Sequence, residues 1–183
     1  MVRVLVPLAE GCEELEAVTI IDLLRRAGID VVTAGLRPGI VKASRGTQLV
    51  PDAALDTVLR DDFDMIVLPG GMPGAQHLKE DSRIIALLKR MAQQGKYTAA
   101  ICAAPMALAE AGLLAGKRAT SYPGFLDKID IPGMAYSKDA VVADGKVLTS
   151  RGPGTAMDFA LALIEALAGR ARRDEVEAGL VRR

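Results

Sequence analysis

The chain has 183 residues, of which 50% are hydrophobic and 25% are charged, and this composition is typical of one compact globular domain. Its 23 Lys and Arg residues balance 23 Asp and Glu residues. A net charge of zero argues against an extended nucleic-acid-binding surface, which carries a basic excess. The N-terminus has no secretory signal pattern, and no stretch has the roughly 20 apolar residues that a membrane-spanning helix needs. We therefore expect a cytoplasmic protein with no nucleic-acid or membrane partner.

The residues that most often bind metals are scarce. The chain contains only Cys12, Cys102 and one histidine, His77, and the two cysteines lie far apart in the sequence. This spacing fits no Cys/His zinc site. We expect no metal and no organic cofactor, and two free thiols in a reducing compartment.

The first half of the chain alternates apolar strand-like runs with segments of helical periodicity. Glycines at the ends of the helical segments stop them. We predict strands at residues 2–8, 30–36 and 65–68, helices at residues 13–27 and 77–94, and short extended pieces near Val41 and at 48–50.

The second half continues this alternation. The dipeptide Asp144-Gly145 is a strong hairpin turn signal. We predict strands at residues 97–101, 140–143 and 146–149, helices at 105–114 and 154–168, and a charged helix or frayed tail at 170–183, and we note a further short segment at 118–121. No repeat or linker divides the chain, so residues 1–183 form one domain.

Alternating strands and helices predict an α/β fold, in which a mostly parallel sheet lies between helices on both faces. In such sheets, ligands bind at the carboxyl ends of the strands. Three predicted strand exits are therefore candidate site segments, at residues 9–16, 69–74 and 102–105.

Cys102 is the strongest candidate nucleophile. It lies between a buried strand and a helix, the position of a nucleophile elbow, where backbone N–H groups and the helix dipole favour a thiolate. We therefore expect a lowered thiol pKa. The alternative is a cysteine that packs as a small buried hydrophobic residue.

Two further features flank that position. Gly70 and Gly71 lack the spacing of a dinucleotide or phosphate loop, and their N–H groups suit an oxyanion site instead. Glu16 lies about one turn into the first helix; in an apolar pocket its carboxyl would stay protonated and donate to a thiolate. The alternative for Glu16 is a favourable interaction with the helix dipole.

Four other residues are weaker candidates for the site. Tyr122 and His77 are the candidates for a general base, and a lone histidine at a helix start is more often a surface residue. Arg45 and Arg151 each precede a glycine and are candidate anion ligands, although exposed arginines are usually only solvated.

Four segments together carry a resemblance to a known family. They are residues 11–17 (GCEELEA), 68–71 (LPGG), 100–105 (AICAAP) and 148–155 (LTSRGPGT). Over residues 2–169 the chain resembles the ThiJ/PfpI superfamily, in the branch of the parkinsonism-associated protein DJ-one and bacterial ThiJ-type relatives. The resemblance implies a flavodoxin-like three-layer sandwich and a homodimer. It also implies an oxidation-prone Cys102, a protonated Glu16 that bonds its sulfur, and oxyanion donors at the Gly71 and Ala103 N–H groups.

The same resemblance implies a cofactor-independent enzyme of the glyoxalase or deglycase type, a lyase or hydrolase that acts on reactive dicarbonyls or their glycated adducts. The alternative is a redox-regulated chaperone or oxidative-stress sensor that uses the same cysteine. Two departures matter: Tyr122 replaces a frequent family histidine, and Ala103 replaces the histidine of the peptidase branch. A peptidase is therefore not expected.

The expected homodimer would use the apolar start of the first helix. Ala17, Val18, Ile20 and Ile21 lie there. The alternative is that these side chains simply cover the sheet. A disulfide between the two cysteines is not expected.

Overall fold

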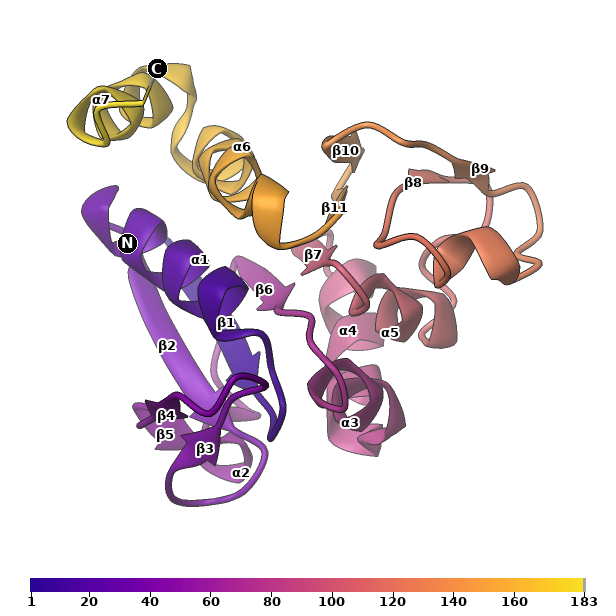
Figure 1. Ribbon diagram of the computed structural model, residues 1–183, viewed down its shortest axis with the longest axis horizontal. Coiled ribbons are helices and arrows are strands. Elements are labelled where there is room, and N and C mark those ends of the chain that lie inside the picture. The colour runs from indigo at the N-terminus through magenta and orange to yellow at the C-terminus, as the bar shows by residue number, and fades with distance from the viewer. Residues whose placement is uncertain (183) are drawn as a thin grey trace.

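The computed structural model describes residues 1–182 and has a seven-stranded sheet at its centre (Figure 1). The strand order is β10-β11-β7-β6-β1-β2-β5, and all neighbours are parallel except β10 and β11. In chain order the strands are β1 (Arg3–Leu8), β2 (Asp30–Gly35), β5 (Ala53–Ala54), β6 (Met65–Leu68), β7 (Tyr97–Ile101), β10 (Val141–Asp144) and β11 (Val147–Ser150).

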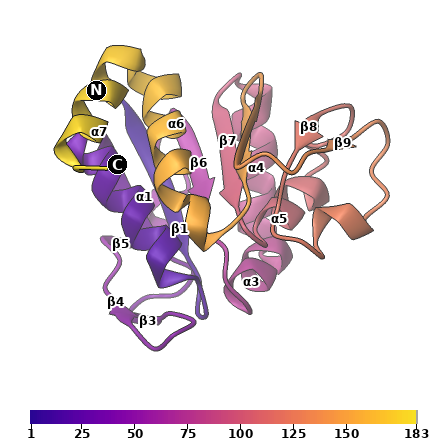
Figure 2. The same cartoon turned by 45° about the horizontal axis from the view of Figure 1, so that its top comes forward.

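Helices cover both faces of this sheet (Figure 2). On one face lie α1 (Glu14–Arg26), α6 (Ala156–Ala168) and α7 (Arg170–Gly179), and on the other lie α3 (Gly74–Glu80), α4 (Ser82–Gln93) and α5 (Pro105–Glu110). A short helix, α2 (Leu55–Val58), follows β5. All four residues of β6 are fully buried, as expected for a central parallel strand that is covered on both sides. The predicted α/β sandwich is confirmed.

Two small sheets extend from this core. The strands β3 (Val41–Lys42) and β4 (Gln48–Leu49) form an antiparallel pair at the two places where short extended pieces were predicted. The strands β8 (Arg118–Ala119) and β9 (Ala135–Tyr136) form a parallel pair, and β8 lies in the short segment noted at residues 118–121.

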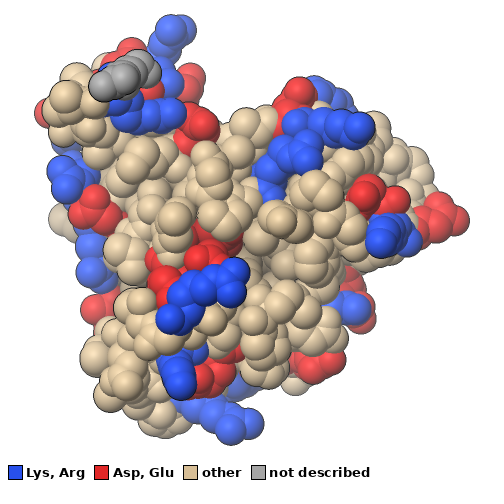
Figure 3. Space-filling model, viewed as in Figure 1, with Lys and Arg blue, Asp and Glu red and all other residues tan. Residues whose placement is uncertain are grey.

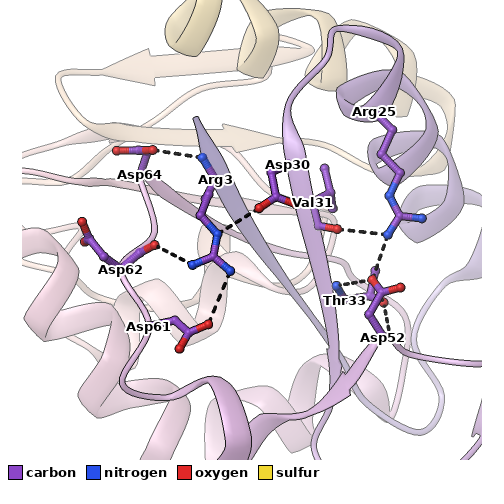
Figure 4. A network of polar contacts seen from close by, with 9 residues as sticks. All are labelled: Arg3, Arg25, Asp30, Val31, Thr33, Asp52, Asp61, Asp62 and Asp64. Carbon is purple, nitrogen blue, oxygen red and sulfur yellow. Dashed lines mark hydrogen bonds and ion pairs between the residues drawn. The ribbon is translucent and has the colours of Figure 1, made fainter. Parts of the chain in front are cut away.

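A polar network ties together the amino ends of three strands (Figure 4). The Arg3 guanidinium pairs with Asp30 at 2.9 Å and with Asp61 at 3.4 Å, and its backbone N–H donates to Asp64 at 3.0 Å. Arg3 begins β1, Asp30 begins β2 and Asp64 directly precedes β6. A ligand site is expected at the carboxyl ends of the strands, and this network lies at the opposite end of the sheet.

Several predicted boundaries are wrong, and the helices predicted to begin at residues 77 and 154 begin at Gly74 and Ala156. The helix predicted over residues 77–94 is two helices, because Asp81 adopts an extended conformation and caps α4 through a 2.9 Å hydrogen bond from the Arg83 N–H. The helix predicted to reach residue 114 ends at Glu110. In the β-hairpin, Asp144 pairs with Val147, so the turn lies one residue later than predicted.

Of the two alternatives predicted for residues 170–183, the structure shows a helix, α7, from Arg170 to Gly179, and residue 183 lies outside the described residues. Within residues 1–182, no helix is both long and apolar enough to span a membrane. Figure 3 shows basic and acidic side chains interspersed on the face that it presents, without a continuous basic surface.

Candidate active site

The three predicted site segments meet at the carboxyl ends of neighbouring strands. The parallel strands β7, β6 and β1 are adjacent in the sheet, so the segments that follow them leave at the same edge. The Glu13 N–H donates to the Gly70 carbonyl at 2.9 Å, which joins the segment after β1 to the segment after β6. Gly70 lies between the two candidate residues, because atoms of Cys102 and Glu16 are among its nearest neighbours.

Cys102 is the first residue after β7 and adopts a φ of 64°, which is rare for a residue with a side chain. Its N–H donates to the Ser150 carbonyl at 3.0 Å, and its own carbonyl accepts from the Tyr122 N–H at 2.8 Å. Because both backbone groups are held, the unusual conformation is maintained. The sharp strand-to-helix turn predicted at Cys102 is confirmed, although α5 begins only at Pro105 and has six residues.

Glycine is required in the neighbouring loop by close contact. A Cβ atom on Gly70 would lie 2.5 Å from the Cys102 Cβ and 2.8 Å from the Glu16 Oε2. Gly71 has a φ of 85°, and a Cβ there would lie 2.3 Å from the Glu13 nitrogen. The loop therefore brings its backbone directly against Cys102 and Glu16, as only glycine permits.

Glu16 is fully buried under this loop. Its Oε2 atom accepts a 2.8 Å hydrogen bond from the Gly70 N–H, whereas its Oε1 atom has no partner among residues 1–182. Burial raises the pKa of Glu16 to about 7, against the lowering effects of the Gly70 N–H and the Cys102 thiol. A pKa near 7 leaves the carboxyl partly protonated near neutral pH, and within residues 1–182 Oε1 is the oxygen without a hydrogen-bond partner.

The thiol of Cys102 differs from the expectation. Burial, followed by the negative charge of Glu16, raises the pKa of Cys102 to about 12, while the Gly71 and Ala103 N–H groups lower it. The predicted lowering of this pKa is therefore wrong for the resting site with Glu16 ionised. A proton on Glu16 removes one of the two main causes, so the thiolate is favoured when the neighbouring carboxyl is neutral.

The second cysteine is also buried. Cys12 has no exposed surface, and burial raises its pKa to about 12. Both cysteines are free. Within residues 1–182, no group of three His, Cys, Asp or Glu side chains is arranged to hold a metal ion.

The weaker candidates are placed differently. Tyr122 adjoins the nucleophile through its backbone, as described above. The Arg151 guanidinium donates to the Lys138 carbonyl at 3.0 Å, and Arg45 is exposed at the turn between β3 and β4. His77 contacts the Glu10 carbonyl at 3.1 Å through Nδ1. Within the described residues, no hydrogen bond joins His77, Arg45 or Arg151 to Cys102 or Glu16.

One contributor was missed at the sequence level. Ser150 holds the Cys102 N–H through its carbonyl, and its hydroxyl donates to the Ala140 carbonyl and contacts the Thr155 hydroxyl, both at 2.7 Å. Ser150 and Thr155 lie in the segment 148–155 that carried the family resemblance. The family resemblance of that segment could have pointed to Ser150 and Thr155. Only the structure shows that Ser150 holds the backbone of Cys102.

The chain is similar in sequence and in structure to known proteins. Its sequence matches the DJ-1/PfpI family over residues 2–166. It is 47% identical over 179 residues to Protein dj-1beta of Drosophila melanogaster, covering 97% of this chain and 95% of that one. The crystal structure of Drosophila melanogaster DJ-1beta superposes with a TM-score of 0.94 at 44% identity, covering 98% of this chain and 97% of that one.

A third similar protein carries an activity in its name. The chain is 41% identical over 160 residues to Glutathione-independent glyoxalase DJR-1.2 of Caenorhabditis elegans, covering 87% of this chain and 85% of that one. The resemblance inferred from the four sequence segments is thus confirmed across nearly the whole length. With its sandwich fold and its cysteine at the turn after β7, the chain belongs to the DJ-1/PfpI family.

Proposed function

We propose that the protein is a cofactor-independent enzyme that converts reactive dicarbonyls, such as methylglyoxal, to hydroxy acids. The observation that carries this proposal is the arrangement of the Cys102 thiol beside a buried carboxyl, Glu16, that has one unpartnered oxygen. The name of the Caenorhabditis elegans relative supports the same chemistry.

The first step uses the thiol and the two amides. Cys102 attacks the aldehyde carbon of methylglyoxal and forms a hemithioacetal. The Gly71 and Ala103 N–H groups, which already lower the thiol pKa, hold the oxygen on which negative charge develops. The ionised Glu16 carboxylate takes the thiol proton and passes it to this oxygen, so that Glu16 is again a carboxylate for the second step.

The second step moves a proton between two carbons. Glu16 removes the proton from the former aldehyde carbon and returns it to the former keto carbon, while the hydroxyl proton of the hemithioacetal passes to the former keto oxygen. The product is a thioester of lactate on Cys102. Water then cleaves the thioester, releasing lactate and the free thiol. The balance is one methylglyoxal and one water consumed for each lactate, so no oxidant or reductant is needed.

The test is lactate formation from methylglyoxal by the purified protein in the presence of a chelator. The Cys102→Ser variant should form no lactate above background, and the Cys12→Ala variant should retain activity, because Cys12 is not in the proposed chemistry. Equal lactate formation by Cys102→Ser would refute the proposal. A deglycase action on early adducts would pass through the same hemithioacetal. Its test is release of the amine from the adduct in the presence of a reagent that traps free methylglyoxal.

A second candidate function is redox sensing or redox-regulated chaperone action. The supporting observation is again the free Glu16 Oε1, which can donate to an oxidised sulfur. Two peroxide molecules would convert the thiolate to a sulfinate and release two water molecules. Suppression of client aggregation only after mild peroxide, and only with Cys102 present, would favour this function over catalysis.

We further propose a cytoplasmic homodimer. Two free thiols fit a reducing compartment. Of the apolar residues at the start of α1, Ala17 and Ile20 are buried, whereas Val18 is 47% exposed and Leu15 is 50% exposed. Met157, on the adjoining helix α6, is also exposed. These outward-facing side chains, and not the whole apolar set, support a contact between two copies.

A further inference from the structure

Tyr122 is joined to the nucleophile but has no part in the chemistry proposed above. Its N–H donates to the Cys102 carbonyl at 2.8 Å, and the Cys102 N–H donates to the Ser150 carbonyl at 3.0 Å. The chain segments at 120–122 and 150–152 therefore flank Cys102 on its two backbone sides. The Tyr122 ring reaches from the first of these segments to the second.

The ring is seated on Gly152. A Cβ atom on Gly152 would lie 3.1 Å from the Tyr122 Cδ2 and 3.7 Å from its Cε2. Gly152 has a φ of 168°, an extended conformation that any residue adopts, so the backbone itself does not require glycine there. The ring also packs against Phe125 in an edge-on arrangement, with centroids 6.4 Å apart. Gly152 and Phe125 thus hold the ring by packing, without a hydrogen bond to its hydroxyl.

Much of Tyr122 nevertheless remains open. The residue is 48% exposed, although a large aromatic side chain loses free energy by facing water. Its hydroxyl makes no hydrogen bond with any of residues 1–182, so no polar contact explains its position. An aromatic ring that is held by packing and is about half exposed offers a surface on which a flat group can stack.

We propose that Tyr122 is a specificity-determining residue of the Cys102 site and selects carbonyl substrates with a planar aromatic or conjugated substituent; this inference rests on the proposed function. The carbonyl carbon is attacked by Cys102 while the substituent stacks on the Tyr122 ring. Gly152 acts as the positioning residue, because its missing side chain leaves room for the ring.

The first experiment compares kcat/KM for phenylglyoxal and methylglyoxal. Stacking of two aromatic groups favours the aromatic substrate by about two- to tenfold. The ratio should fall by this factor in Tyr122→Leu and should be retained in Tyr122→Phe, which keeps the ring and removes the hydroxyl. An unchanged ratio in Tyr122→Leu, or an equal loss in Tyr122→Phe, would overturn the proposal.

The second experiment moves the ring without removing it. In Gly152→Ala the new methyl group meets the Tyr122 ring, so the ratio should fall although Tyr122 is present. Gly154→Ala is the matched control, because a Cβ at Gly154 meets nothing within 4 Å. Equal ratios of kcat/KM for the two substrates in these two variants would contradict the role of Gly152 in positioning the Tyr122 ring.

A third measurement does not depend on turnover. Iodoacetamide and N-phenyl iodoacetamide both alkylate Cys102, with formation of a sulfur–carbon bond and loss of iodide. The ratio of the two rates should fall in Tyr122→Leu as the substrate ratio does. If no dicarbonyl is turned over but this ratio falls, the proposed enzyme function fails and the aromatic selectivity stands; an unchanged ratio refutes the selectivity itself.

Discussion

The pair of Glu16 and Cys102 shows what burial does to two ionisable side chains. Both residues could be singled out from the sequence, because Cys102 lies at a strand exit and Glu16 lies in the first turn of a helix that begins at the same sheet edge. The pKa of Cys102 could not be predicted, because it depends on how deeply the thiol is buried and on the charge of Glu16 beside it. The position of Cys102 at a strand end predicts that nearby backbone N–H groups lower the thiol pKa. Only the packed structure shows that burial raises it.

The raised pKa of Glu16 makes stability depend on pH. A glutamate ordinarily has a pKa of 4.5, whereas the pKa of Glu16 in the fold is about 7, so the folded state holds the proton more tightly. The contribution of Glu16 to the free energy of unfolding is therefore fully present below pH 4.5. It decreases by about 3 kcal/mol as the pH rises to 7. In Glu16→Gln this loss is absent.

Urea unfolding of both proteins at pH 4.5, 6 and 7.5 measures this effect. The stability of Glu16→Gln relative to the unmodified protein should increase with pH, since the other titrating groups are common to both. A constant difference across the three pH values would show that the pKa of Glu16 is not raised by folding.

The charge of Glu16 should also control the reactivity of Cys102. Because that charge raises the thiol pKa, Glu16→Gln should increase the iodoacetamide alkylation rate of Cys102 at pH 8. Mass spectrometry of the two cysteine peptides gives both rates in one sample. Cys12 is the internal control, because its pKa is raised by burial and by other glutamates, and its rate should not change. A slower Cys102 in Glu16→Gln would reverse the assigned direction.

Among the helices and strands, the sequence predicted the long buried strands and missed local interruptions. The β6 segment is apolar throughout and could be recognised by that alone. The break between α3 and α4 could not, because apolar residues recur at helical spacing on both sides of Asp81 and a single aspartate within such a run does not mark a boundary. The capping hydrogen bond from the Arg83 N–H decides it.

This cap gives a prediction on stability. Asp81 accepts the Arg83 N–H at 2.9 Å and pairs with its guanidinium at 2.6 Å. Asp81→Ala should lower the free energy of unfolding by about 1 kcal/mol, because it leaves the first N–H groups of α4 without this acceptor. Asp81→Asn keeps a capping oxygen and should lose less. Urea unfolding at pH 7 measures both, and equal losses would assign the effect to the ion pair instead.

Across the molecule, the sheet edge that gathers the site is also the edge at which α1 begins. Glu16 faces inward from that helix, whereas Leu15 and Val18, on either side of it along the chain, face outward. The same helix turn thus supplies a site residue and an apolar surface. A contact between two copies through this surface would lie next to the site, which connects the proposed assembly to the proposed chemistry.

The dimer proposal predicts the mass in solution. Multi-angle light scattering at micromolar concentration should give twice the chain mass of 19.3 kDa. Val18→Glu places a charge in the proposed apolar contact, where it would be desolvated, and should shift the mass toward the single chain. The matched control is Val50→Glu, because Val50 is 78% exposed and lies outside α1 and α6. Dissociation by both variants would point to a general loss of stability, and a single-chain mass for the unmodified protein would refute the dimer.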